Sequence, residues 1–186
     1  MTSLDDLWFL ADEAEREAER TYYRLREAHD DYLERTATRG VSRHRFRTLA
    51  ERIRDHGAPY GAHTVVYRDS GELLLVRDTV VEQWVPPGGA IDGDESFREA
   101  AERELGEEAG VEAEFEGLGL LTRVRIRADG YETWGVLPVF AARAVTHEPD
   151  VSDPDGEIAE ARWFDEIPEN TRDREDLVAW RDRILD

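Results

Sequence analysis

The stretch from Gly89 to Val111, GAIDGDESFREAAERELGEEAGV, constrains this chain more than any other part of it. Ser96 is followed three residues later by Glu99, which is the spacing of a capping box and predicts that a helix begins there. Gly110 is placed to end this helix, because glycine readily adopts the left-handed conformation found at helix C-caps. The sequence therefore predicts a helix between two well-defined caps.

The predicted helix carries carboxylates on the face that a helix normally buries. Phe97 and Ala101 begin an apolar stripe, and at ~100° per residue Glu104 and Glu108 continue it. Glu107 lies beside them, so three carboxylates converge on one patch and repel one another unless a cation or a proton neutralises them. Oxygen ligands of this kind suit Mg²⁺ or Mn²⁺, and the stretch contains neither His nor Cys. We therefore predict a divalent cation site for phosphate chemistry.

A solvated acidic face is the ordinary alternative, because 44 of the 186 residues are acidic. The spacing of the whole stretch argues against it: five residues separate Gly89 from Glu95, and seven more precede the run RELGEEAGV at Arg103. A chance match to all these positions is on the order of a few in a hundred thousand. The stretch resembles the signature of the Nudix hydrolase family, G-x5-E-x7-R-E-U-x-E-E-x-G-U with U a bulky aliphatic residue. The resemblance covers about residues 58 to 170.

The resemblance implies a catalytic role for five residues of the pattern. Glu104, Glu107 and Glu108 would bind the divalent cations, Mg²⁺ or its substitute Mn²⁺, and would help to deprotonate water. Arg103 and Glu95 would brace the loop against the helix. This set suits hydrolysis of a phosphoanhydride, which needs charge neutralisation on the phosphate oxygens and an activated water but no covalent nucleophile.

Two further parts of the chain complete the implied site. Gly88 and Gly89 match the tight turn that lets the backbone approach a diphosphate, and Gly89 also belongs to the implied metal-ligand set. Family members often place another acidic residue near the end of the domain, facing the metals. Glu160 is the preferred match, with a plain surface glutamate as the alternative. The nearby DPDG segment does not fit a calcium loop, because Arg162 stands where the bidentate glutamate belongs.

Arginines are the candidates for contact with substrate phosphates. Arg123, Arg125 and Arg127 alternate with apolar residues, so they share one face of a predicted strand. Arg125 and Arg77, which ends another strand, could steer a diphosphate. The alternative is that these arginines only balance neighbouring acidic side chains.

The pattern of the whole chain predicts an α/β fold in which strands surround one central helix and a closing one. The expected strands span 63–67, 72–76, 80–86, 112–127, 131–145 and 158–164, and the closing helix spans 175–185. The first two strands should form a hairpin around Arg68-Asp69-Ser70-Gly71. This pattern agrees with the α/β/α sandwich with a mixed sheet that the resemblance implies, for a domain over residues 58–186.

Residues 1–57 are predicted to form an N-terminal helical hairpin. The first helix, opened by Ser3, has a heptad-like seam: Leu4, Leu7, Ala11, Ala14, Ala18, Thr21, Leu25, Ala28 and Tyr32. The segment TATRG is expected to end it. Ser42 should cap the second helix, Gly57 should end it, and Phe46, Leu49, Ala50 and Ile53 form its apolar stripe. The hairpin could pack on its own catalytic domain, mediate a homodimer, or form a lid over the substrate.

Charge and composition limit which partners and which environment are expected for the protein. The net charge is −20 and all 24 basic residues are arginine. Strong self-repulsion of this kind is screened at molar salt, so we predict a cytosolic protein of a salt-accumulating halophile, with a merely acidic high-GC organism as the alternative. No basic patch is evident, so a nucleic acid polymer is not the expected partner. An acidic N-terminus and the absence of a long apolar run predict a cytoplasmic protein without membrane contact.

The expected function is Mg²⁺-dependent hydrolysis of a nucleoside diphosphate linked to another group. Nucleoside triphosphates, ADP-ribose and nucleotide sugars all remain open as substrates. The alternative is a Nudix-like module that binds a nucleotide for regulation and has lost catalysis. The complete set of glutamates favours the enzyme.

Overall fold

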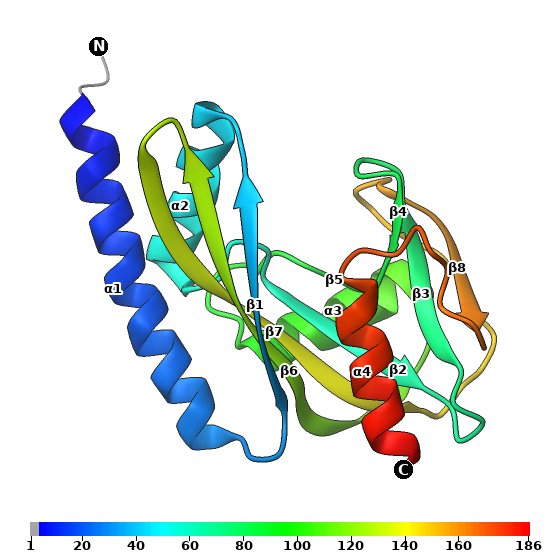
Figure 1. Ribbon diagram of the computed structural model, residues 1–186. Helices are drawn as coiled ribbons and strands as arrows, with labels where there is room; N and C mark the ends of the chain where they lie inside the picture. Colours follow the sequence, from blue (N-terminus) through cyan, green and yellow to red (C-terminus); the bar gives the residue numbers. More distant parts are fainter. Residues whose placement is uncertain (1–3) are drawn as a thin grey trace. The chain divides into compact units, whose positions relative to one another are not determined.

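The computed structural model describes residues 4–186, which group by their mutual contacts into two compact units (Figure 1). The N-terminal unit contains the chain up to Gly61 together with residues 121–138, and the C-terminal unit contains residues 62–120 and 139–186. Two long strands, β6 (Ala113–Ala128) and β7 (Tyr131–Ala144), contribute to both units. Each unit has a hydrophobic core of its own.

The N-terminal unit contains two helices and one strand besides its share of β6 and β7. They are α1 (Leu4–Ala28), β1 (Leu33–Gly40) and α2 (Arg43–His56), and the strand order is β1-β6-β7. Apolar side chains of both helices and of the β6–β7 hairpin share one core, which includes Leu7, Leu10, Ala14, Phe46, Leu49, Ile53, Val124 and Ile126. Within residues 4–186, no helix is long and apolar enough to cross a membrane.

The two predicted N-terminal helices are present and pack against each other, but a strand and not a turn connects them. Tyr32 was expected on the first helix and instead follows its end at Ala28. The TATRG segment was expected to end the first helix and instead forms most of β1, after the helix has ended at Ala28. Side chains of β1 alternate between half-buried and exposed, so the strand has no apolar face that its sequence could reveal. The predicted cap at Ser3 lies outside the described residues.

Local signals located α2 correctly. The Oγ of Ser42 accepts a hydrogen bond from the backbone N–H of Arg45 at 3.1 Å, and Gly57, with a φ of 82°, ends the helix. The predicted apolar stripe is fully buried: Phe46, Leu49, Ala50 and Ile53. The alanines of the α1 seam are also buried in the core of their own chain: Ala11, Ala14 and Ala18. This burial favours packing of the seam within the chain.

The C-terminal unit is built on a mixed sheet. Its further strands are β2 (Ala62–Tyr67), β3 (Leu73–Asp78), β4 (Gln83–Val85), β5 (Gly88–Gly89) and β8 (Ile158–Phe164). The strand order is β6-β7-β2-β3-β4, while β5 pairs with β2 and β8 pairs with β3. Strand β2 runs parallel to β7 and antiparallel to β3. The expected hairpin of the first two strands is therefore confirmed.

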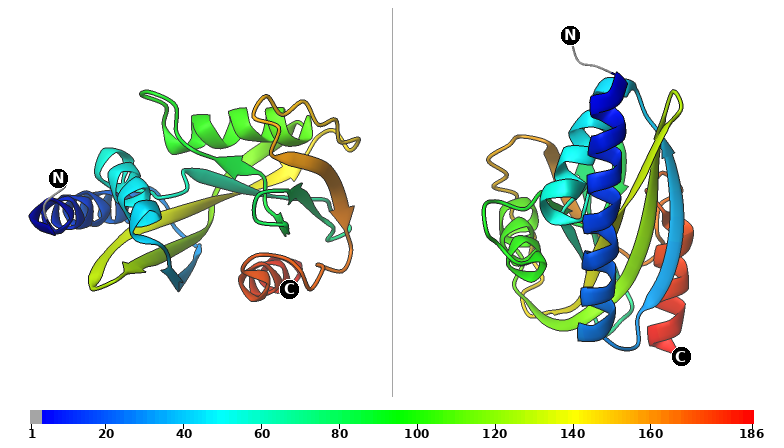
Figure 2. Two further views of the ribbon diagram at one scale, coloured as in Figure 1. Left: turned by 90° about the horizontal axis from the view of Figure 1, so that it is seen from above. Right: turned by 90° about the vertical axis from the view of Figure 1, so that its left-hand side faces the viewer.

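Two helices cover opposite faces of this sheet in the C-terminal unit. The helix α3 (Phe97–Ala109) packs Leu105 against Val66 and Val76 of the sheet. On the other face, Tyr67 lies edge-on to Trp180 of α4 (Arg174–Leu185) with 5.6 Å between the ring centres. Neighbouring residues of a strand point to opposite faces, so Val66 and Tyr67 assign one helix to each side. The predicted α/β/α sandwich with a mixed sheet is confirmed (Figure 2).

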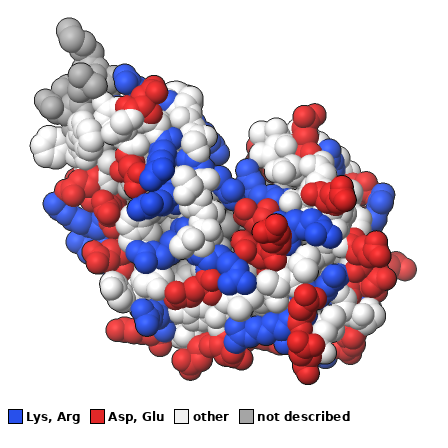
Figure 3. Space-filling view, in the orientation of Figure 1, with Lys and Arg blue, Asp and Glu red and all other residues white. Residues whose placement is uncertain are grey.

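The negative charge is unevenly distributed over the chain. The N-terminal unit has almost as many arginines as acidic residues, so nearly all of the net charge of −20 belongs to the C-terminal unit. Arg123, Arg125 and Arg127 are exposed and alternate with buried residues of β6, as their spacing predicted. Figure 3 shows arginine side chains gathered over β1 and the β6–β7 hairpin. The N-terminal unit therefore departs from the acidic character of the rest of the protein.

Candidate active site

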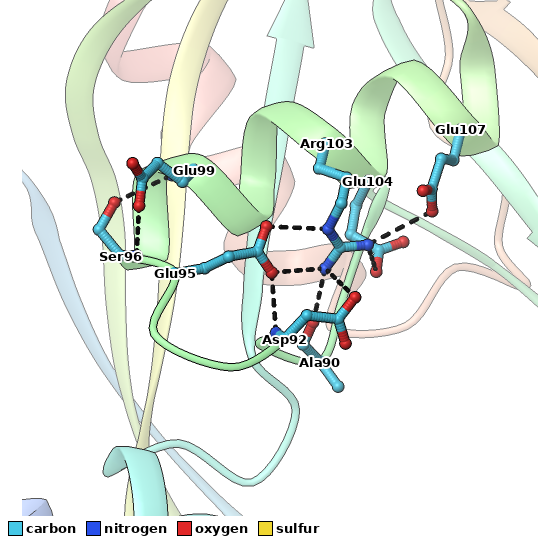
Figure 4. Close-up of polar contacts among 8 residues, drawn as sticks. All are labelled: Ala90, Asp92, Glu95, Ser96, Glu99, Arg103, Glu104 and Glu107. Atoms are coloured by element: carbon cyan, nitrogen blue, oxygen red, sulfur yellow. Dashed lines mark hydrogen bonds and ion pairs between the residues drawn. The ribbon is translucent and has the colours of Figure 1, made fainter.

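Both predicted caps of the helix α3 are present. The Oγ of Ser96 accepts a hydrogen bond from the N–H of Glu99 at 3.1 Å, and the N–H of Ser96 donates to a carboxylate oxygen of Glu99 at 2.7 Å (Figure 4). Gly110 adopts a left-handed φ of 62° and its N–H donates to the carbonyls of Leu105 and Gly106. These caps determine where α3 begins and ends, and therefore which of its side chains turn toward the sheet.

Two of the three predicted carboxylates lie on the buried face of α3. Glu104 is 7% exposed and Glu108 is 8% exposed, beside Ala101 and Leu105 of the same face. Glu107 is half-buried at the edge of this face. Carboxylates are almost never buried to this degree unless they are paired or bind a cation.

Arg103 joins the helix to the loop that precedes it. Its Nε donates to Glu95 at 2.9 Å and its Nη2 donates to the other oxygen of the same carboxylate at 3.0 Å (Figure 4). The Nη2 group also donates to the carbonyl of Ala90 at 3.0 Å. Paired parallel hydrogen bonds of this kind fix the position of both groups. The structure thus brings Arg103 and Glu95 together as the sequence predicted.

The same guanidinium also contacts two of the predicted metal ligands. The Nη1 group of Arg103 donates to Glu104 at 2.9 Å and to Glu107 at 3.3 Å. Several carboxylates therefore share one positive charge, and Glu95 and Glu104 are the main causes of the raised pKa of Arg103. Arg103 is the cation that balances this part of the cluster.

The Gly88-Gly89 turn lies directly against the carboxylates. The N–H of Gly88 donates to Glu108 at 3.0 Å. A Cβ atom at Gly89 would lie 2.6 Å from a carboxylate oxygen of Glu104, and one at Gly88 would lie 2.4 Å from the carbonyl of Ala62. A side chain at position 88 would clash with backbone, and one at position 89 would displace the carboxylate of Glu104. The turn and α3 therefore form one site, with backbone exposed to whatever the carboxylates bind.

Burial controls the protonation of the two inner carboxyl groups. Desolvation raises the pKa of Glu108 to about 9, although the hydrogen bond from Gly88 opposes the shift. Desolvation also raises the pKa of Glu104, against the opposing effect of Arg103. Without a metal ion, Glu108 therefore holds a proton at neutral pH, which relieves the repulsion within the cluster.

This protonation predicts a pH-dependent stability of the metal-free protein. The pKa of Glu108 is raised in the fold, so the folded state holds a proton that the unfolded chain has lost above pH ~4.5. Stability should therefore fall as the pH rises from about 4.5 to about 9. Thermal melts in EDTA should show a larger decline for the parent than for Glu108→Gln. Equal declines would contradict the assignment to Glu108.

The donors present fit a divalent cation, although their side chains do not converge on one point in this structure. Among residues 4–186, no group of three His, Cys, Asp or Glu side chains is arranged around a common metal position. The reason is visible in the hydrogen bonds: Arg103 draws Glu104 and Glu107 toward itself, and Gly88 holds Glu108. A cluster of carboxylate oxygen donors nevertheless suits a hard divalent cation, which would displace the proton of Glu108 on binding.

Glu160, the predicted further acidic ligand, does not join this cluster. It is opposite Arg77 in the β3–β8 pairing, whereas its neighbour Ala161 is opposite Val76 and packs toward α3. Its carboxylate therefore lies on the face of the sheet away from α3, where it pairs with Arg162. A register shift between Arg77 and Asp78, which the sequence does not reveal, precedes this part of the strand pair.

Two aspartates that sequence reasoning did not select lie near the α3 carboxylates. Asp153 contributes to the raised pKa of Glu108, and Asp155 contributes to that of Glu104. Their loop is tied to the C-terminal end of α3, because the N–H of Ser152 donates to the carbonyl of Glu107 at 3.0 Å. Both aspartates belong to the DPDG segment, whose acidic residues are the sequence signal for this part of the site.

The predicted substrate-binding arginines lie in different units. Arg77 is on β3 in the C-terminal unit, on the face of the sheet covered by α4. Its buried Nη1 has no hydrogen-bond partner among residues 4–186. Buried His63 Nδ1 and Thr171 Oγ1 in the same unit also lack partners, and burial lowers the pKa of His63 to about 4. Arg125 lies in the N-terminal unit and pairs with Glu132 at 3.4 Å. Arg77 thus has an unused donor, whereas Arg125 is paired.

Comparison with known proteins connects this geometry to a family. The sequence profile of the NUDIX domain matches residues 58–184. A Bacillus subtilis (strain 168) protein named as a putative 8-oxo-dGTP diphosphatase is 34% identical, over 45% of this chain and 67% of its own length. The structure of a NUDIX hydrolase from Nitrosomonas europaea matches with a TM-score of 0.52 at 19% identity, over 66% of this chain and 69% of its own. A MutT NUDIX hydrolase from Burkholderia pseudomallei matches with a TM-score of 0.47 at 28% identity, over 63% and 93%.

The profile match covers most of the chain and contains the whole stretch from Gly89 to Val111. The Nitrosomonas structure supports the same fold. Proteins of this family generally use divalent metal ions. The chain therefore belongs to the NUDIX family, and it is an enzyme that hydrolyses phosphoanhydrides.

Proposed function

We propose that the α3 cluster is the catalytic centre, and that it hydrolyses a small substrate in which a nucleoside diphosphate is linked to another group. The observation that carries this proposal is the burial of Glu104 and Glu108 directly against the Gly88-Gly89 turn. Buried carboxylates beside an accessible backbone turn are suited to a substrate that brings phosphate groups and a cation together.

Mg²⁺ is the proposed cofactor, with Mn²⁺ as a substitute. Glu104, Glu107 and Glu108 would hold it together with the backbone of Gly89. When bound, the metal ion would neutralise charge on the phosphate oxygens and lower the pKa of a water molecule. Glu160 stays a prediction as a further ligand, and the position of its carboxylate favours Asp153 and Asp155 instead.

The side chains of this site would position the substrate and accept the proton of the attacking water. A carboxylate of the cluster could accept this proton, and Glu108 could do so only when a bound cation keeps it ionised at neutral pH. Arg103 and Glu95 would keep the loop and α3 in a fixed relation. Gly88 and Gly89 would approach the diphosphate. Arg77 and Arg125 stay predictions as phosphate-contacting side chains, because Arg77 lies on the sheet face away from α3 and Arg125 belongs to the other unit.

The substrate is best identified by a panel of nucleotides assayed with Mg²⁺ in molar KCl, with the products identified by mass spectrometry. The panel contains ordinary and oxidised nucleoside triphosphates, ADP-ribose and nucleotide sugars. We would assay 8-oxo-dGTP first, because the Bacillus subtilis relative is named as a putative 8-oxo-dGTP diphosphatase. A nucleoside monophosphate product supports the proposal. Tight binding of a nucleotide without turnover would favour the regulatory binding module instead.

The domain boundary and the partners are part of the same proposal. Residues 1–57 form the N-terminal extension, and residues 58–186 form the Nudix domain. The substrate is a small molecule and not a nucleic acid polymer or a membrane, which agrees with the concentration of negative charge in the C-terminal unit. A homodimer is the proposed assembly if the extension associates with a second copy, and a cytoplasmic location is proposed from the composition.

We also propose that the protein functions at high salt, because it has no lysine and a net charge of −20. The unscreened carboxylates repel one another in dilute buffer, whereas at molar salt the Debye length is only ~3 Å. The melting temperature should therefore rise steadily from dilute buffer to molar KCl, and divalent cations should partly replace the salt. A melting temperature that does not change with KCl would remove the halophile interpretation.

A further inference from the structure

The guanidinium of Arg103 has two sides with different partners. Its Nε and Nη2 groups face Glu95 at 2.9 and 3.0 Å, which connects the helix to the preceding loop. Its Nη1 group faces Glu104 and Glu107, which belong to the set proposed to hold the metal ion. One side therefore braces the structure, and the other side occupies carboxylates that the cation needs (Figure 4).

The ion pairs of Arg103 with Glu104 and Glu107 are only partly exposed to water. The side chains of Arg103 and Glu104 are 26% and 10% exposed, and that of Glu107 is 32% exposed. Ion pairs that are only partly solvated are stronger than those on an open surface. A divalent cation that approaches Glu104 and Glu107 is therefore repelled by a positive charge already in contact with both.

We infer that Arg103 is a built-in counter-cation that competes with the divalent metal for Glu104 and Glu107. This inference rests on the proposed function of the α3 cluster. In the metal-free protein the Nη1 group donates to both carboxylates and offsets part of their charge. Metal binding requires the two carboxylates to leave this group. The contact with Glu95 is retained, so Arg103 remains attached to the loop while its other side is released. Arg103 is thus a positioning residue that sets the cation concentration at which the site fills.

The inference predicts that removing the positive charge strengthens metal binding. Mn²⁺ binding to the full chain is measured at constant ionic strength by the electron paramagnetic resonance signal of the free ion. Arg103→Gln should bind Mn²⁺ about tenfold more tightly than the parent, because one repelling charge a few ångströms from a divalent ion is gone. The metal-free variant should melt at a lower temperature than the parent, and Mn²⁺ should raise its melting temperature by a larger amount.

A matched control is available on the same helix. Arg98 donates to Glu102 at 2.9 Å in an exposed ion pair outside the cluster. Arg98→Gln removes the same charge from the same helix and should change the Mn²⁺ affinity by less than about twofold. If the Arg103→Gln variant binds Mn²⁺ no more tightly than the parent, the inference is overturned. Arg103 would then position the metal ligands and not compete for them.

The proposed function and the competing role of Arg103 can be contradicted separately. If Glu108→Gln binds Mn²⁺ as tightly as the parent, the cluster is not the metal site, and both the proposed function and the inference fail. If Glu108→Gln loses both binding and hydrolysis while Arg103→Gln binds no more tightly than the parent, only the inference fails.

A second measurement avoids substitution, in case Arg103→Gln does not fold. The parent protein with ¹⁵N-labelled arginine is titrated with Mg²⁺ and followed by nuclear magnetic resonance. The Nη1 signal of Arg103 should shift as Mg²⁺ binds, whereas its Nε and Nη2 signals should stay in place because the bonds to Glu95 are retained. An unchanged Nη1 signal at saturating Mg²⁺ would show that Arg103 keeps its bonds to Glu104 and Glu107, and would overturn the inference.

Discussion

Replacing Glu108 by Gln should lower the rate of Mg²⁺-dependent hydrolysis by two to three orders of magnitude. Glutamine keeps the size and helix propensity of the side chain but removes one negative charge and one good oxygen ligand. A metal ion contributes several kcal/mol to transition-state stabilisation, and each ~1.4 kcal/mol corresponds to a tenfold change in rate. Glu104→Gln and Glu107→Gln should act in the same direction. Release of a nucleoside monophosphate at saturating substrate measures the effect.

The structure supplies a control on the same helix. Glu102 is exposed and pairs with Arg98, away from the cluster. Glu102→Gln should therefore leave the rate within about twofold of the parent, because an exposed ion pair contributes little. Equal losses for Glu108→Gln and Glu102→Gln, or no loss for either, would exclude the α3 cluster as the catalytic centre and would favour the binding module.

Stability distinguishes a lost ligand from a damaged fold. The buried carboxyl of Glu108 has a pKa raised to about 9, so its ionisation opposes folding above pH ~4.5. Without cation, Glu108→Gln should melt no lower than the parent at neutral pH. A strongly lowered melting temperature would mean that the loss of activity reflects unfolding.

The sequence predicted α3 well because the signals for it are local. Ser96, Glu99 and Gly110 act within a few residues of one another, and the spacing of the glutamates follows from the helix period alone. The contact between Arg103 and Glu95 was also predicted, through the family resemblance. The contact of Arg103 with Glu107 was not predicted, although these residues are four apart on the helix.

The features that the sequence did not predict depend on contacts between distant parts of the chain. The strand β1 is held by pairing with β6, and its own residues alternate without an apolar face. The orientation of Glu160 depends on the register of β8 against β3, which shifts near Arg77. The grouping of residues 121–138 with the N-terminal unit depends on two long strands that serve both units. Strand pairing, register and the grouping of strands into units cannot be predicted from any one short segment of the sequence.

Ala14→Glu tests how the N-terminal unit is held together. Ala14 is fully buried in the core that α1 shares with α2 and the β6–β7 hairpin. The neighbouring elements are close: the hydroxyl of Thr133 donates to the backbone carbonyl of Ala11 at 3.0 Å, and a Cβ atom at Gly57 would lie 2.1 Å from Thr21. A glutamate at position 14 therefore has neither room nor a partner for its charge.

The expected result is a loss of about 3–5 kcal/mol of stability, the range found when a buried charge is left uncompensated. Since whole domains are stable by only ~5–15 kcal/mol, the N-terminal unit should melt well below the parent or not fold. Ala28→Glu is the control, because it adds the same side chain at an exposed position at the end of α1 and should change the melting temperature little.

Size-exclusion chromatography distinguishes packing of the α1 seam within the chain from dimerisation through it. A lowered melting temperature with an unchanged elution volume indicates packing within the chain, as the burial of Ala14 requires. A shift from dimer to monomer elution with an unchanged melting temperature would mean that the seam binds a second copy.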